Sequence, residues 1–141
     1  SKGLGAPVGS VLIGTKDAIN NGKRVRKALG GGMRQAGYLA AACTYALDHH
    51  LDKIKDDHRR AQILASAIEN LPFVSSLYPV QTNIIIIALK PDRSPQIFLK
   101  KLEKKGLLAI GFGPGLIRIV THLDFNDKQM EKAIQIFKTL E

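Results

Sequence analysis

The sequence predicts an α/β protein that ends in a small α+β domain, with an antiparallel sheet and flanking helices. A strand-like apolar run at 8–14 precedes long helical patterns over 17–71. Short apolar strands then alternate with helices over 72–141, and turns rich in glycine and proline separate them. We therefore expect three parts: residues 1–50 as the end of a larger domain, residues 51–71 as a linking helix, and residues 72–141 as the small domain.

The N-terminal part is expected to hold one strand and two helices. Residues 8–14 are apolar except for Ser10, which is typical of a strand covered on both faces. A helix is expected over 17–29, although Asn20-Asn21-Gly22 favours a break within it. Three glycines at 30–32 indicate a turn, because they cost too much conformational entropy inside a helix. The spacing of Ala and Leu then predicts a helix over 33–50.

The next expected element is a long amphipathic helix that has Asp52 as its cap and ends at Leu71. Pro72 stops it, because proline cannot continue a helix from within. Its apolar stripe consists of Ile54, Ala61, Leu64, Ala65, Ile68 and Leu71. This helix is expected to link the two domains.

Four strands and two helices are expected after Pro72. The strands are expected at 73–78, 83–89, 107–110 and 116–121, and the helices at 94–105 and 127–140. Ser94 is the expected cap of the first helix, with Pro95 at its first position and Gly106 at its end. The glycine-rich residues 111–115 indicate the turn of a hairpin.

Composition and charge exclude several classes of protein. The chain has 141 residues, of which 45% are hydrophobic, so we expect a globular protein with one core or two small ones. No apolar run approaches the roughly 18 residues that a membrane-spanning helix needs, and no signal-peptide pattern is present. The single Cys43 rules out an internal disulfide framework and fits a reducing cytoplasm. Its place in an Ala-rich helix indicates a buried side chain.

The formal net charge of +9 raises the alternative of a basic module that binds nucleic acid. The basic cluster consists of Lys23, Arg24, Arg26 and Lys27. It lacks interleaved aromatic residues and lies on an expected helix, where a solvated charged face is the ordinary explanation. We expect neither a nucleic-acid partner nor a membrane partner. No metal site is expected either, because no Cys and His residues have the spacing of metal ligands.

Lys2 is the first candidate for chemistry. It lies on a loop of small residues, where Gly3 and Gly5 allow a ligand to approach closely and Pro7 fixes one turn. A primary amine becomes a nucleophile once it loses its proton. The sequence therefore makes Lys2 a candidate for covalent catalysis, with an ordinary surface lysine as the alternative.

Arg118 and Arg34 are the other candidates. Arg118 is flanked by apolar residues in its expected strand, where a charge needs water, a partner or a ligand; a guanidinium can hold a carboxylate through two parallel hydrogen bonds. Arg34 follows three glycines at the expected start of a helix, where backbone amides favour anions such as phosphate. Solvated arginines are the alternative for both, and a solvated side chain is the better interpretation of nearby Lys27. His122 shares the strand face of Arg118 and is expected to be structural.

Three stretches also carry a family resemblance. They are SKGLGAPVGS at 1–10, KALGGGMRQAG at 27–37 followed by YALDHH at 45–50, and IRIVTHLD at 117–124. They resemble the low-specificity L-threonine aldolases, which are lyases dependent on pyridoxal 5'-phosphate (PLP). The resemblance implies the C-terminal part of the fold-type-I, aspartate aminotransferase-like fold, beginning at the cofactor lysine. It also implies that Lys2 bonds covalently to PLP, that Arg34 reaches the cofactor phosphate of a neighbouring subunit, and that Arg118 binds the substrate α-carboxylate.

The same resemblance implies an activity for the intact enzyme. That activity is cleavage of L-threonine or L-allo-threonine to glycine and acetaldehyde, in threonine catabolism, by a cytoplasmic homotetramer. Other cofactor-binding residues of the family are expected upstream of Ser1, so we expect these 141 residues alone to be inactive and to hold the cofactor poorly. A fold-type-I lyase that acts on aromatic amino acids by β-elimination is the alternative activity.

Overall fold

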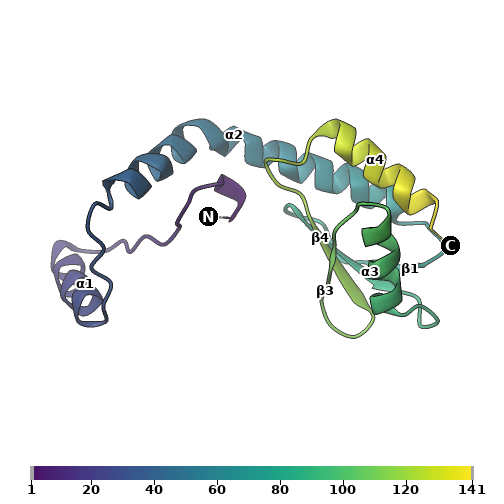
Figure 1. Ribbon diagram of the computed structural model, residues 1–141, viewed down its shortest axis with the longest axis horizontal. Coiled ribbons are helices and arrows are strands. Elements are labelled where there is room, and N and C mark those ends of the chain that lie inside the picture. Colours follow the sequence, from purple (N-terminus) through teal and green to yellow (C-terminus); the bar gives the residue numbers. More distant parts are fainter. Residues whose placement is uncertain (1, 141) are drawn as a thin grey trace. The chain divides into compact units, whose positions relative to one another are not determined.

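The computed structural model describes residues 2–140, and Ser1 and Glu141 lie outside the described residues. The chain divides into two compact units, Ser1–Leu51 and Asp52–Glu141. The first unit contains a short 3₁₀ turn, η1 (Lys2–Leu4), helix α1 (Lys16–Ala28) and the first part of helix α2 (Gly37–Ile68) (Figure 1). The second contains the rest of α2, a four-stranded sheet and two further helices.

Helix α1 confirms the helix expected at 17–29. The Thr15 hydroxyl caps it by accepting a hydrogen bond from the Ala18 amide at 3.3 Å. The helix continues through Asn20-Asn21-Gly22, so the expected break is wrong. Gly30 then takes a φ of +83°, which confirms the glycine turn, because glycine adopts this left-handed conformation without steric cost.

The strand expected at 8–14 is not formed. These residues pair with no other strand among residues 2–140, and Val11 and Ile13 are 84% and 89% exposed. A strand exists only where a neighbouring chain accepts and donates its backbone hydrogen bonds. The described chain supplies no such neighbour, so the apolar run stays extended and uncovered.

Helix α2 is a single helix of 32 residues, although the sequence analysis expected two helices, at 33–50 and 52–71. Neither glycine nor proline interrupts the sequence between Gly37 and Pro72, so nothing ends the first helical pattern before the second begins. Asp52 is therefore inside the helix rather than at its cap. Its carboxylate pairs with Lys55 Nζ at 2.8 Å on the exposed surface.

The unit of residues 52–141 is built on an antiparallel sheet with the strand order β1-β2-β4-β3 (Figure 1). The strands are β1 (Val74–Leu77), β2 (Ile84–Leu89), β3 (Ile110–Gly111) and β4 (Leu116–Val120). The expected strands at 73–78, 83–89 and 116–121 are thus confirmed within one or two residues at their ends. The strand expected at 107–110 is shorter than predicted, because residues 107–109 do not pair with β4 and the Leu107 amide bonds instead to the Leu102 carbonyl at 3.0 Å.

Three helices cover one face of this sheet. They are the second part of α2, α3 (Pro95–Lys104) and α4 (Asp127–Lys138). The core between the helices and the sheet contains Leu64, Ile68, Phe73, Ile85, Ile87, Phe98, Leu102, Ile117, Ile119, Ala133 and Phe137, all buried. Alternate residues of β2 and β4 point into this core, so Ile86 and Arg118, which lie opposite each other across the two strands, belong to the uncovered face.

Polar contacts fix the ends of these elements. Asn126 forms a capping box with Gln129 at the start of α4, and Asp127 accepts hydrogen bonds at 2.8 Å from both Arg59 and Arg60 of α2. Thr121 donates its amide to the Asn83 carbonyl at 3.0 Å, and the Asn83 amide group donates to the Thr121 carbonyl at 2.7 Å. These contacts join α4 to α2 and the end of β4 to the start of β2.

Ser94 and Gly106 bound α3 as expected. The Ser94 side chain, however, donates a hydrogen bond to Gln96 Oε1 at 3.0 Å and makes no bond to the helix amides. Gly106 has a φ of +80° just after the helix. No helix within residues 2–140 combines the length and the apolar character that crossing a lipid bilayer requires.

Candidate active site

Arg118 lies in the middle of β4 on the uncovered face of the sheet. Ile86 of β2 and Ile110 of β3 flank it on either side, and the Phe112 ring centroid lies 5.3 Å from its guanidinium carbon. Arg118 is half-buried, and its Nε atom is buried without a hydrogen-bond partner. Among residues 2–140, no side chain forms an ion pair or hydrogen bond with it.

This arrangement gives Arg118 a strong preference for an anionic ligand. A half-buried charge among apolar side chains has lost part of its hydration, and no described residue of the unit supplies a compensating ion pair. The cation–π contact with Phe112 offsets only part of that cost. A planar carboxylate could accept two parallel hydrogen bonds from the guanidinium, so this sheet face is suited to a carboxylate group.

His122 lies two residues beyond the end of β4, and Asp57 of α2 is joined to the neighbouring Thr121 by a hydrogen bond. His122 is exposed, and its Nδ1 accepts a hydrogen bond from the Asp124 amide at 3.3 Å. Asp57 is only 1% exposed, and burial raises the pKa of its carboxyl above the usual range, although the nearby Arg60 and His122 act in the opposite direction. Both of its carboxylate oxygens lack a hydrogen-bond partner among the described residues, and Arg60 Nη1 lies 3.6 Å from one of them.

Asp57 was missed by the sequence analysis. It lies in a run of charged residues on α2, which indicated a solvated helix face. The only local signal was the i, i+3 spacing to Arg60, which is common on exposed helices as well. The contact that joins Asp57 to the end of β4 comes from Thr121, whose hydroxyl donates to the Asp57 carbonyl at 2.7 Å from 64 positions away in the chain.

Lys2 is exposed and adopts a φ of +63°, a left-handed conformation that is uncommon for residues other than glycine. Its carbonyl accepts a hydrogen bond from the Gly5 amide at 2.9 Å, which closes the short turn η1. The expectation of a lysine on a tight loop is therefore confirmed. Strained backbone conformations of this kind persist only where surrounding contacts hold them.

Two residues of α2 supply contacts that hold the Lys2 loop. His50 Nδ1 lies 2.6 Å from the Leu4 carbonyl oxygen, and Cys43 Sγ donates to the Val8 carbonyl at 3.5 Å. No pattern in the sequence indicated either role. Cys43 is half-buried rather than buried, and His50 lies inside α2 rather than at a helix end. These contacts are made across 35 and 46 positions, so no local pattern reveals them.

Arg34 is exposed and lies three residues before α2, not in its first turn as expected. The difference arises because Gln35 takes a φ of +51°, which the helix cannot accommodate. Beside this segment, Lys27 Nζ lies so close to Gly32 that a Cβ atom on Gly32 would approach it to 2.8 Å. The bend thus presents backbone and cations together, with Arg34 unpaired among residues 2–140.

The three predicted site residues fall in both units. Lys2 and Arg34 belong to Ser1–Leu51, where no hydrogen bond or ion pair joins their side chains, and Arg118 belongs to Asp52–Glu141. The structure surrounds Lys2 with an anchored loop and Arg118 with an apolar sheet face. Within residues 2–140, no group of three or more His, Cys, Asp or Glu side chains could hold a metal ion.

Comparison with known proteins identifies the family. The family model described as beta-eliminating lyase matches residues 1–91. The chain belongs to the beta-eliminating lyase family. The matched residues of this beta-eliminating lyase chain include the Lys2 loop, the glycine turn at 30–32, helix α2 and the first two strands.

Individual relatives show which kind of family member the chain is similar to. It is 38% identical over 143 residues to the probable low-specificity L-threonine aldolase 2 of Arabidopsis thaliana, covering 99% of this chain and 40% of the relative. It is 36% identical over 133 residues to the low specificity L-threonine aldolase of Escherichia coli O157:H7, covering 94% of this chain and 38% of the relative. The chain therefore spans about two fifths of the length of these relatives.

Solved structures confirm the expected fold class. A C-DES mutant with glycine covalently linked to its PLP cofactor matches with a TM-score of 0.59 at 16% sequence identity, covering 75% of this chain and 29% of the other. At this identity the match shows a shared fold. The small antiparallel sheet with its flanking helices is thus the C-terminal part of a fold-type-I architecture.

Proposed function

We propose that this chain is part of a PLP-dependent aldolase that cleaves L-threonine or L-allo-threonine to glycine and acetaldehyde. The observation that carries the proposal is the half-buried Arg118, a guanidinium without a counter-charge on an apolar sheet face. An amino-acid substrate presents the carboxylate that such a group requires. The aldolase relatives, at 36–38% identity, support the same substrate class.

Each candidate residue has a separate task in this proposal. Lys2 is the amine that would hold the cofactor aldehyde covalently, Arg34 would hold the cofactor phosphate at a subunit boundary, and Arg118 would fix the substrate α-carboxylate. When bound, PLP supplies an electron sink that stabilises negative charge on the substrate α-carbon. Arg118 contributes positioning, because a carboxylate held at two points fixes the direction of the bond to be broken.

The described residues fit the cofactor and the substrate chemically. The Lys2 amine is exposed on a loop whose glycines leave room for a ligand, and it has no ion-pair partner among residues 2–140. Arg34 likewise has no acidic partner, in a bend that brings cations and backbone close together. Unpaired cations of this kind are the groups that phosphates and carboxylates select.

The organisation of the intact protein is also part of the proposal. It comprises the end of a PLP-binding domain at 1–50, a linking segment at 51–71 and a small domain at 72–141. The assembly is a homotetramer that works in threonine catabolism in the cytoplasm, without nucleic-acid or membrane partners. The supporting observations are the similarity to threonine aldolases and the residue Arg34, which no described group of its own unit neutralises.

A chimaera tests the proposal. The part of the E. coli aldolase that its match leaves uncovered is joined to residues 1–141, and threonine-dependent release of acetaldehyde is measured after PLP is added. We expect turnover and a visible absorbance band, both lost in Lys2→Ala and both retained in the control Lys16→Ala, which changes an exposed lysine on α1. A folded chimaera without a Lys2-dependent band would contradict the cofactor role.

The same chimaera separates the proposed reaction from β-elimination on aromatic amino acids. The observation that favours this second activity is the description of the family as beta-eliminating lyase. Tyrosine and tryptophan are supplied in place of threonine, and release of phenol or indole is followed. We expect no release from either; release that exceeds acetaldehyde formation would favour the aromatic lyase.

A further inference from the structure

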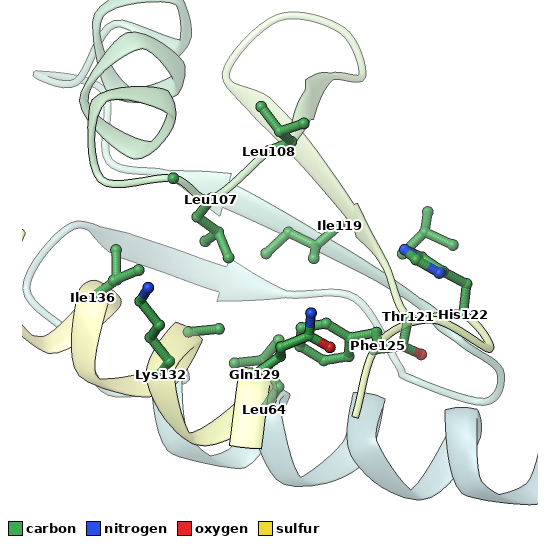
Figure 2. A pocket seen from close by; sticks show the side chains of 13 residues that line it. Leu64, Leu107, Leu108, Ile119, Thr121, His122, Phe125, Gln129, Lys132 and Ile136 are labelled. Carbon is green, nitrogen blue, oxygen red and sulfur yellow. The ribbon is translucent and has the colours of Figure 1, made fainter. Parts of the chain in front are cut away.

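The unit of residues 52–141 contains a cavity that the proposed aldolase chemistry does not use. Its volume is about 380 Å³, within the range of about 300–1,000 Å³ that is typical of small-molecule sites. It lies between α4 and the segment that leads from α3 to β3 (Figure 2). Its floor is apolar and consists of Leu64, Leu107, Ile119, Phe125, Ala133 and Ile136.

The cavity exists because β3 separates from β4. Their pairing stops at Ile110 and Arg118, and Leu108, which would lie opposite Val120 in a longer ladder, is 79% exposed. The N–H and C=O groups of Val120 point to the same strand edge as those of Arg118. No residue of 2–140 forms a hydrogen bond with them, so an open backbone edge lines the cavity.

The polar side chains around the cavity are hydrogen-bond donors. Figure 2 shows Lys132 and Gln129 projecting from α4 beneath Leu107 and Ile119. Lys132 has no ion-pair or hydrogen-bond partner among residues 2–140, and Gln129 Oε1 already accepts from the Asn126 amide at 2.8 Å, which leaves its NH₂ group to donate.

His122 supplies a third donor at the rim. Its Nδ1 accepts from the Asp124 amide, so in the neutral ring the proton resides on Nε2. Among residues 2–140, no aspartate or glutamate lines the cavity. These three donors lie above an apolar floor, and the Thr121 hydroxyl, which also lines the cavity, already donates its proton to the Asp57 carbonyl. The set suits an anion with an apolar body.

We propose that this cavity binds a small monocarboxylate that has an apolar tail and no amino group. The carboxylate pairs with Lys132 and accepts a hydrogen bond from Gln129, while the tail packs on Leu107, Ile119 and Ile136. An α-amino acid is disfavoured, because its ammonium group would be brought next to Lys132 with no carboxylate to receive it. The cavity floor belongs to the helix-covered face of the sheet, opposite to Arg118, so the site is independent of the aldolase proposal.

Binding is tested by titrating the ¹⁵N-labelled 141-residue chain with 4-methylpentanoate and recording amide chemical shifts. We expect saturable shifts that centre on Gly106, Val120 and Lys132. Leucine carries the same tail and carboxylate plus an ammonium group, and 4-methylpentan-1-ol lacks the charge. Both are expected to bind at least about tenfold more weakly.

A matched pair of variants tests the role of Lys132. Lys132→Gln removes the ammonium group in the cavity, and we expect about five- to tenfold weaker binding of 4-methylpentanoate. Lys128→Gln changes an exposed lysine of the same helix outside the cavity, and affinity should not change. Absence of saturation, equal binding of leucine, or unchanged affinity in Lys132→Gln would each overturn the proposal.

Discussion

Arg118 shows how one residue can define the chemistry of a surface. Its neighbours across the sheet are Ile86 and Ile110, and an aromatic ring covers part of its guanidinium. Apolar surroundings weaken hydration and strengthen any ion pair that forms. The guanidinium is therefore suited to bind one carboxylate, and its planar shape matters as much as its charge.

Replacing Arg118 with lysine keeps the charge and removes the two-point contact. In the chimaera we expect kcat/KM for L-threonine to fall by about a hundredfold, because a single ammonium cannot fix the orientation of the carboxylate. Steady-state kinetics check this result, with Arg59→Lys as the control, since Arg59 pairs with Asp127 on the exposed surface. An unchanged kcat/KM would remove Arg118 from the substrate site.

Phe112 should influence how well Arg118 binds its ligand. Its ring restrains the guanidinium, and a cation–π contact of this kind contributes about 0.5–1 kcal/mol at a partly exposed position. We expect Phe112→Leu to raise KM about two- to fivefold with little change in kcat. Phe112→Tyr keeps the ring, so its KM should equal that of the wild type. A raised KM in Phe112→Tyr as well would show that the effect comes from a change in the loop and not from the loss of the ring.

Asp57 should make stability depend on pH. Because burial raises its pKa, the folded chain holds this proton at pH values where the unfolded chain has lost it. The stability from this group is fully present below the unfolded pKa of about 3.9 and is lost as the pH rises through the higher folded value. We expect the free energy of unfolding of Asp57→Asn, relative to wild type, to increase from pH 4 to pH 7, as urea unfolding can measure. A difference that stays constant with pH would contradict this.

At the scale of elements, α2 supports the Lys2 loop through contacts that its own sequence pattern does not reveal. His50 and Cys43 bond to carbonyl groups of Leu4 and Val8, within the unit Ser1–Leu51. Most of residues 5–15 are exposed, so little side-chain packing restrains the loop. The position of the Lys2 amine therefore depends on the integrity of one helix face.

Removing the His50 imidazole should loosen this loop. In His50→Ala we expect the amides of residues 3–9 to exchange with solvent about tenfold faster, because a half-buried hydrogen bond that contributes about 1–1.5 kcal/mol is lost. Hydrogen exchange measured by mass spectrometry checks this. His49→Ala is the control, because His49 contacts Tyr45 rather than the loop. Equal exchange in the two variants would show that the loop is held in another way.

The sequence predicted those helices, strands and turns that form because of local residue patterns. Apolar periodicity indicated α1, α4 and the isoleucine-rich β2, and the residues at caps and turns placed Ser94 and Gly106. It did not predict that 8–14 would remain unpaired, because the pairing of a strand depends on a neighbour and not on the strand itself. The site residues also divide into local and distant cases. Arg118 could be predicted because it is a charge in an apolar run. Asp57 and His50 could not, because their roles depend on contacts with residues distant in the chain.

At the scale of the whole chain, burial is distributed very unevenly. Among residues 2–51 only Ala46 is buried, whereas the core of aromatic and aliphatic side chains lies entirely in residues 52–140. Stability scales with the apolar area removed from water. Residues 52–140 should therefore be the cooperative folding unit, and residues 2–51 should gain little stability from their own packing.

Truncating a core aromatic tests this difference. Phe137 is fully buried and touches the Phe73 ring, so Phe137→Ala should reduce the free energy of unfolding of this unit by about 3–5 kcal/mol. Hydrogen exchange recorded at increasing urea concentrations measures the loss of unfolding free energy in each region. Protection should fall across 52–140 and remain unchanged in α1. A comparable loss in both regions would mean that the chain unfolds as one cooperative body.

The four consecutive isoleucines of β2, Ile84 to Ile87, have a consequence for how the chain reaches its native state. A strand with identical residues on both faces can slide by one position without changing its hydrophobicity, so the pattern alone does not choose the pairing. The reciprocal bonds between Asn83 and Thr121 exist in only one alignment. These two polar residues therefore select the native alignment of β2 against β4 from misaligned pairings of similar free energy.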